Sequence, residues 1–198
     1  MKIANEALSD LKVYARKVYS INHNMPILTM LITEDEHKEL CKGYEEWLKQ
    51  SKARGILKDV DKKEDVSHRS EEFCPNAACC FPLVHKHPPL PMLTMIVETV
   101  FTIPNFAKYK YAIIIREERL SEYTKGFTNL KKLGNGEATD RERRMFALAD
   151  LLTHEFLHII ERELKIRIYT DDLEKDRRMV ADTLKRIGRF NNLQKYVL

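Results

Sequence analysis

Apolar residues in the first third of the chain recur with the spacing of amphipathic helices. Leucine, alanine and valine stand three and four residues apart between Ile3 and Tyr19, which predicts a helix over this range. Thr33 and Glu36 have the spacing of a capping box, in which two side chains satisfy free backbone amides, so a second helix is expected to begin there. We therefore expect residues 1–72 to form a helical N-terminal part.

The following segment, residues 73–91, holds five prolines, three cysteines and two histidines. Proline fixes φ and lacks an amide hydrogen, so this density of prolines predicts irregular structure. Thiolates and imidazoles so close together are able to hold a structural zinc ion, and buried free thiols or a disulfide are the alternatives. The residues concerned are Cys74, Cys79, Cys80, His85 and His87.

The second half of the chain contains the clearest strand and two long helices. Tyrosine and isoleucine alternate with other residues over Lys108–Arg116, which predicts a β-strand. Helical patterns follow over about 140–165 and 171–188. The residues expected to cap these helices are Thr139 or Asp140 for the first and Thr170 for the second. Long helices with a short strand predict a helix-rich α+β fold, and 198 residues favour a single domain over 1–198.

Charge and composition restrict the class of partner. The 34 basic and 30 acidic residues give a net charge of only +4, which argues against a dedicated nucleic-acid binder. No apolar run approaches the roughly 20 residues of a membrane span, and the N-terminus lacks the pattern of a secretory signal, so a cytoplasmic protein is expected. Many Lys, Arg and Glu residues beside only two Gln are typical of a thermophile protein.

The expected helix over 140–165 contains the sequence His154-Glu155-Phe-Leu-His158. Side chains four residues apart lie on the same face of a helix, so both imidazoles are able to reach one zinc ion. Glu155 lies about 100° around the helix from His154, where it is able to hydrogen-bond a zinc-bound water without ligating the metal. Asp150 and Glu161 continue the same polar stripe and are expected to support the histidines by hydrogen bonds.

These residues resemble the motif of the zincin metallopeptidases. The resemblance implies one catalytic zinc ion on His154 and His158, with Glu155 as general base and later proton donor. It also implies a zincin-like fold, in which a small antiparallel sheet packs on the long active-site helix and an edge strand binds the substrate backbone. Lys108–Arg116 is the candidate for that strand, with Ala112, Ile113 and Ile114 at its centre.

The third metal ligand departs from the known zincin subgroups. Leu164 stands where the metzincins have a histidine, and Arg178 stands where the gluzincins have a glutamate. Helix geometry offers substitutes, because carboxylates near the apolar side of the last helix face the core. Asp176 is the first candidate, and the alternatives are Asp172 and Glu174. Asp172 has a second interpretation as a helix cap.

The function expected from these residues is hydrolysis of peptide bonds in a peptide or protein substrate by a metal-activated water. A zincin-like module that binds or regulates without cleaving is the first alternative, favoured by Arg178. A nucleic-acid-associated protein that uses the basic last helix is the second. The cofactor is one catalytic Zn²⁺, with a second, structural ion in the Cys/His segment as an option, and the oligomeric state is left open.

Overall fold

The computed structural model describes the chain in several stretches: residues 2–21, 24–53, 74, 76–83, 97, 100–103, 105–128, 131–132, 136–170, 172–186 and 196–197. The elements in chain order are α1 (Lys2–Tyr19), β1 (Ile27–Ile32), α2 (Glu34–Ala53), β2 (Ala78–Pro82), the 3₁₀ helix η3 (Phe106–Lys108), β3 (Tyr111–Arg116), α4 (Glu117–Lys125), β4 (Lys131–Lys132), α5 (Asp140–Leu164), α6 (Leu173–Arg186) and β5 (Tyr196–Val197). The protein is therefore a helix-rich α+β protein, as expected.

The main sheet has three strands in the order β1-β3-β2, and β4 pairs with β5 in a separate ribbon. β1 runs parallel to β3, whereas β2 runs antiparallel to it. The prediction of an antiparallel sheet holds for β2 and β3 but is wrong for β1, because the chain between β1 and β3 includes the long helix α2. A crossover of that length allows the two strands to run in the same direction.

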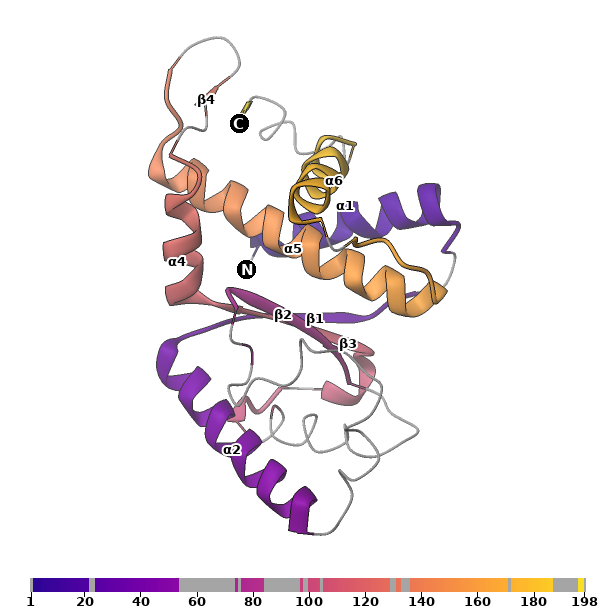
Figure 1. Ribbon diagram of the computed structural model, residues 1–198, viewed down its shortest axis with the longest axis vertical. Helices are drawn as coiled ribbons and strands as arrows, with labels where there is room; N and C mark the ends of the chain where they lie inside the picture. The colour runs from indigo at the N-terminus through magenta and orange to yellow at the C-terminus, as the bar shows by residue number, and fades with distance from the viewer. Residues whose placement is uncertain are drawn as a thin grey trace.

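Helices cover both faces of this sheet (Figure 1). α1, α5 and α6 lie on one side and α2 lies on the other. Alternate side chains of β3 point to opposite faces of the sheet, as the pleat of a strand requires. Ile113 and Ile115 belong to the apolar cluster under α5, whereas Ala112 and Ile114 belong to the cluster on the α2 side. All six residues of β3 are buried, so this strand is the centre of the core.

The capping boxes place the helix starts where the sequence predicts them. The Thr33 hydroxyl accepts from the Glu36 amide at 3.3 Å and the Glu36 carboxylate accepts from the Thr33 amide at 2.7 Å. Thr139 and Glu142 make the same reciprocal pair at the start of α5. α1 also matches its prediction, but the description of 1–72 as helical misses β1. β1 is a short apolar run that pairs with β3, a strand distant in the sequence.

The prediction of irregular structure over 73–91 is wrong at β2. The run Ala78–Pro82 carries its proline only at its last residue, where a missing amide hydrogen does not interrupt the ladder to β3. Residues 84–91, and with them His85 and His87, lie outside the described residues.

The last helix begins later than predicted and has a different cap. Oδ1 of Asp172 accepts from the amides of Glu174 and Lys175 at 3.1 and 3.2 Å, so Asp172 caps α6 in place of Thr170. In the described stretches, no helix combines the length and apolar character needed to cross a membrane.

Candidate metal centre

His154 and His158 lie side by side on α5, as their spacing predicts. Their ring centroids are 4.9 Å apart and the ring planes meet at 79°. An imidazole nitrogen lies about 2.0–2.1 Å from zinc and the ring centre roughly 1 Å beyond it, so two imidazoles on one tetrahedral ion have centroids about 5 Å apart. The two rings therefore have the separation that a shared zinc ion requires.

Glu161 fixes the orientation of His158. Nδ1 of His158 lies 2.9 Å from Oε2 of Glu161, and a carboxylate is an acceptor, so the ring proton belongs on Nδ1. The lone pair is then on Nε2, the nitrogen left for a ligand. His158 is 36% exposed, so this nitrogen belongs to a ring that solvent reaches.

His154 is neutral over a wide range of pH. Burial lowers the pKa of His154 to about 4, and the neighbouring His158 acts in the same direction, while the charges of Asp176 and Glu161 oppose the shift. Only a neutral imidazole has a lone pair for a metal ion. The environment of His154 therefore suits a metal ligand at neutral pH.

Glu155 is turned toward the sheet edge, away from bulk water, with 7% of its surface exposed. Burial raises the pKa of Glu155, and three nearby features oppose the shift: His158, hydrogen bonds from the Cys80 side chain and backbone, and Arg162. A carboxylate with a raised pKa is a stronger base. Sequence reasoning missed the contact with Cys80, because it joins residues 75 positions apart through the register of β2.

The outer edge of β2 is covered by side chains of α5. The Ala77 carbonyl accepts from the Arg116 amide of β3, and the Leu83 amide donates to the carbonyl of Lys110, just before β3. Alternation along an antiparallel strand turns the N–H and C=O of Cys80 to the other side. The Cys80 N–H donates to Glu155, and its C=O accepts from Nη1 of Arg162 at 3.3 Å. A peptide added to this edge would have to displace Glu155 and Arg162 at Cys80.

The prediction of a substrate-binding edge strand around Ala112, Ile113 and Ile114 is wrong. These residues lie in β3, which pairs with β1 on one side and β2 on the other. Their backbone groups are used within the sheet, and all three side chains are buried. The alternation of tyrosine and isoleucine correctly indicated a strand, although the strand begins at Tyr111 and not at Lys108, which belongs to η3. Alternation carries no information on whether a strand is central or at an edge.

Asp150 supports the site differently from the prediction. Its Oδ2 accepts a hydrogen bond of 2.5 Å from the hydroxyl of Tyr123 on α4, and burial raises the pKa of Asp150. Besides Tyr123, the charge of Asp150 interacts with Arg177 and with Tyr169, the tyrosine that follows α5. Asp150 ties α4 to α5 one turn before His154.

The three candidate third ligands occupy different positions at the start of α6. Asp172 caps the helix, and Glu174 pairs with Arg178 four residues later on the exposed side. Asp176 is half-buried, and its charge acts on His154. Oδ1 of Asp176 accepts from the amide and the hydroxyl of Thr170, at 2.8 and 2.9 Å. Asp176 is therefore the candidate whose negative charge acts on the histidine pair, through its effect on the pKa of His154.

Tyr169 completes the site, and no motif pointed to it. Its ring centroid lies 4.7 Å from that of His154 and 4.2 Å from that of His158. Across the described stretches of the chain, no three His, Cys, Asp or Glu side chains come close enough together to hold a metal. The histidines and Glu161, with Tyr169 against them, therefore form a two-histidine site.

The cysteines of the predicted structural zinc site lie on both faces of the sheet. The Cys79 thiol hydrogen-bonds to Cys74, and both belong to the apolar cluster on the α2 side. Cys80 faces α5 and Glu155. Because neighbouring strand residues point in opposite directions, Cys79 and Cys80 cannot ligate one ion. All three are free thiols, as is Cys41.

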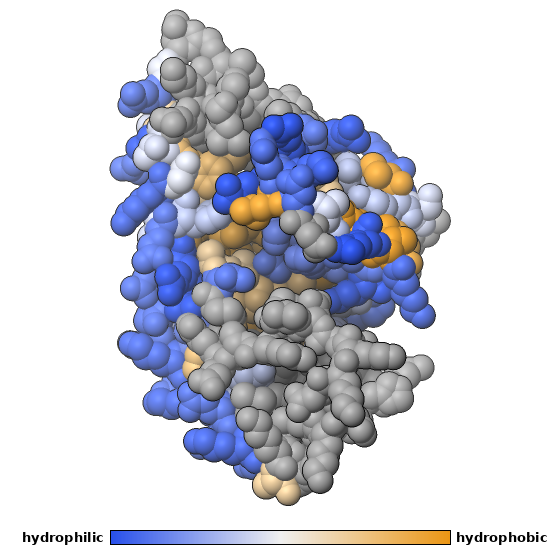
Figure 2. All heavy atoms as spheres, in the orientation of Figure 1, coloured by the Kyte–Doolittle hydropathy of each residue, from blue (hydrophilic) through white to orange (hydrophobic). Residues whose placement is uncertain are grey.

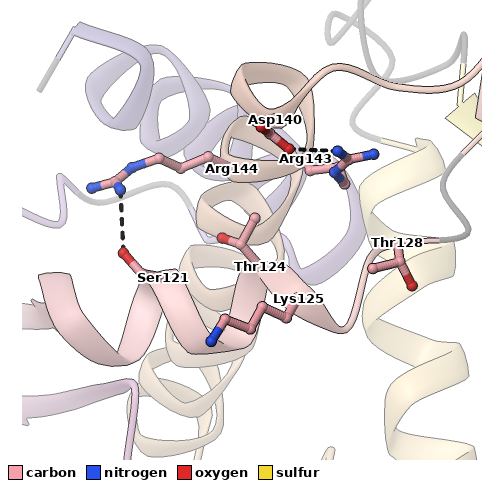
Figure 3. A pocket seen from close by; sticks show the side chains of 7 residues that line it. All are labelled: Ser121, Thr124, Lys125, Thr128, Asp140, Arg143 and Arg144. Carbon is pink, nitrogen blue, oxygen red and sulfur yellow. Dashed lines mark hydrogen bonds and ion pairs between the residues drawn. The ribbon is translucent and has the colours of Figure 1, made fainter.

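A hollow of about 310 Å³ lies elsewhere, between α4 and the start of α5. Figure 3 shows its lining of hydroxyl and cationic side chains, among them Lys125, Arg143 and Arg144. Both arginines are used within the protein, since Arg143 pairs with Asp140 and Arg144 with a glutamate of α4. Arg144 precedes His154 by ten residues, about 15 Å along the helix, so the hollow is separate from the histidine pair.

Two large hydrophobic side chains are exposed in the part of the chain that follows α5. Ile166 and Leu173 flank the segment that carries Tyr169 and are 43% and 66% exposed. Figure 2 shows hydrophobic surface around α6 within an otherwise hydrophilic face.

The chain matches no family model, no curated protein and no solved structure. The class of site that can be assigned from the chain itself is a pair of helix-borne imidazoles with a carboxylate on one ring and a buried carboxylate beside them.

Proposed function

We propose that this protein is a zinc-dependent hydrolase of the zincin type, which acts on peptide bonds. The observation that carries the proposal is the pair of imidazoles with centroids 4.9 Å apart, one of them held by Glu161. His154 and His158 would hold the ion. Asp176 does not form a three-ligand group with them in the described structure, so it would have to approach the ion from α6 to become the third ligand. When bound, zinc would lower the pKa of a water molecule and polarise the scissile carbonyl.

The residues of the chain then have separate tasks. Glu155 takes a proton from water and passes it to the leaving amine, a role that its raised pKa supports. Glu161 keeps Nε2 of His158 free of its proton. Ile166 and Leu173 provide apolar surface for substrate side chains. Strand addition at Cys80 is not part of the proposal, because Glu155 and Arg162 use that edge of β2.

A second candidate function is a zincin-like module that binds zinc without hydrolysis. The observation that favours it is the hydrogen bonding of Glu155 to the Cys80 backbone and thiol. To act as a general base, Glu155 would have to break these hydrogen bonds, or accept a further one from water. In the second candidate Glu155 remains a structural bridge between α5 and β2.

Metal analysis and a hydrolysis assay distinguish these functions. Purified protein should contain about one zinc ion per chain and cleave unfolded casein, with loss of cleavage on chelation. Glu155→Gln should keep the zinc and lose cleavage, whereas His158→Ala should lose both. Zinc bound by a wild-type protein that cleaves nothing would establish the binding module, and absence of zinc binding at micromolar concentration would refute both candidates.

A further inference from the structure

Tyr169 makes contacts that neither the motif nor the proposed reaction requires. The residue follows α5 by five positions, and the chain there turns back along the helix. Its ring packs on His154 and His158 together, tilted by 44° and 35° to their planes. With 9% of its surface exposed, Tyr169 covers the histidines on one side.

Tyr169 is held in place by hydrogen bonds of both its side chain and its backbone. Its hydroxyl donates to the backbone carbonyl of His154 at 2.8 Å. Its amide and that of Ile168 donate to Oε1 of Glu161, at 2.8 and 2.6 Å. Oε2 of the same carboxylate accepts from Nδ1 of His158. One carboxylate thus joins the Tyr169 backbone to one histidine, while the Tyr169 hydroxyl holds the backbone of the other.

We infer that Tyr169 is a positioning residue that holds both imidazoles ready for the metal, together with Glu161. The inference rests on the proposed zinc site and adds to it a residue that does not ligate. An imidazole at a partly exposed position samples several rotamers, and ordering it on binding costs affinity. Partners that orient ligating histidines typically contribute about 10–100-fold to metal affinity.

Zinc affinity of single variants tests this role. We expect Tyr169→Leu to weaken Zn²⁺ binding by about 10–100-fold, measured by competition with a chromogenic chelator. Tyr169→Phe keeps the aromatic ring against both imidazoles, so it should lose less zinc affinity than Tyr169→Leu. Tyr14→Leu is the matched control, because Tyr14 is also 9% exposed and lies in the same apolar cluster without contacting the histidines. The control should fold and bind Zn²⁺ as the wild type does.

A measurement on metal-free protein gives a second readout that needs no activity. Nitrogen-15 NMR of the histidine rings should show wild-type His158 in one neutral tautomer with its proton on Nδ1. Tyr169→Leu should show an averaged signal, because the backbone amide to Glu161 remains but the ring that packs on His158 is lost. Mixed tautomers at His158 in the wild type would overturn the inference, whether or not Tyr169→Leu folds.

The outcomes separate this inference from the proposed function. If wild type and Tyr169→Leu bind Zn²⁺ with equal affinity, Tyr169 has no positioning role and the zinc site stands. If Tyr14→Leu weakens binding as much as Tyr169→Leu, the effect is one of general stability and the inference also fails. If the wild type binds no Zn²⁺, the proposed function fails, and with it the inference that depends on it.

Discussion

Nδ1 of His158 and Oε2 of Glu161 lie 2.9 Å apart, while Oε1 of the same carboxylate accepts two backbone amides. Glu161→Gln retains the shape of this side chain but makes one end a donor. The amide oxygen is needed by Ile168 and Tyr169, so the NH₂ group faces His158. The imidazole must then carry its proton on Nε2, the nitrogen meant for zinc. We expect a loss of zinc affinity of about 10–100-fold, measured by chelator competition.

Glu142→Gln is the matched control for Glu161→Gln. Glu142 lies on the same helix and accepts from the Thr139 backbone, far from the histidines. Its substitution should lower stability slightly through the capping box and leave zinc affinity unchanged. Equal zinc affinity in Glu161→Gln and wild type would show that the carboxylate does not set the His158 tautomer.

Cys80 supports Glu155 through both its backbone and its thiol. Cys80→Ala removes the thiol and leaves the backbone N–H, so Glu155 loses one of two donors from this residue. We expect the free energy of unfolding to fall by about 1–3 kcal/mol, from the lost hydrogen bond and the small cavity. Urea unfolding measures this loss. An unchanged midpoint would show that the thiol does not stabilise the buried carboxylate.

The thiols of Cys79 and Cys80 should be slow to alkylate. Burial raises the pKa of both thiols, and the charge of Glu155 acts in the same direction. Because the thiolate is the nucleophile, a raised pKa leaves little reactive form at pH 8. Iodoacetamide labelling followed by mass spectrometry should modify neither residue in the native protein and all four cysteines of the chain in guanidinium. Rapid native labelling of Cys80 would contradict its position against α5.

High pH should destabilise the fold through three tyrosines. Burial raises the pKa of Tyr111, Tyr123 and Tyr169, with carboxylates beside them adding to the shift. Above the ordinary tyrosine pKa of about 10, the unfolded chain has released these protons and the folded chain still holds them. The folded state then binds more protons, so stability falls as pH rises beyond this value.

Absorbance at alkaline pH measures this effect. Tyrosinate formation should occur in two stages, with Tyr111 and Tyr169, which are 5% and 9% exposed, ionising only together with loss of the helical circular dichroism signal. The stability that these groups contribute is complete below about pH 10 and is lost above it. A single titration near the ordinary pKa, complete before unfolding, would contradict the burial of these hydroxyls.

Local sequence patterns predicted the helices that carry the site, but not the residues that other elements of the fold bring into contact with it. Thr139 and Glu142 cap α5 through neighbouring contacts, and the spacing of His154 and His158 is a property of one helix. β2 escaped prediction because its pairing with β3 depends on distant register and its surroundings are rich in proline. The contact of Cys80 with Glu155 and the packing of Tyr169 follow from that tertiary arrangement, which no local pattern encodes.

α5 has one face in the core and another that carries the histidines. Phe156 is wholly buried in the core, whereas the motif histidines on the same helix face Tyr169. Phe156→Ala should lower the free energy of unfolding by about 3–5 kcal/mol, because it leaves a cavity in the packed core. Leu173→Ala, at a side chain 66% exposed, should change it by at most about 0.5 kcal/mol.

Urea unfolding of the two variants, with zinc affinity measured below the transition, tests this division. Phe156→Ala should retain zinc affinity wherever it is folded, since the substituted ring does not contact the imidazole pair in the structure. Comparable stability in Phe156→Ala and Leu173→Ala would mean that α5 is rotated from the orientation described here. In that case the histidines would point toward the sheet, and the site would lose its access to solvent.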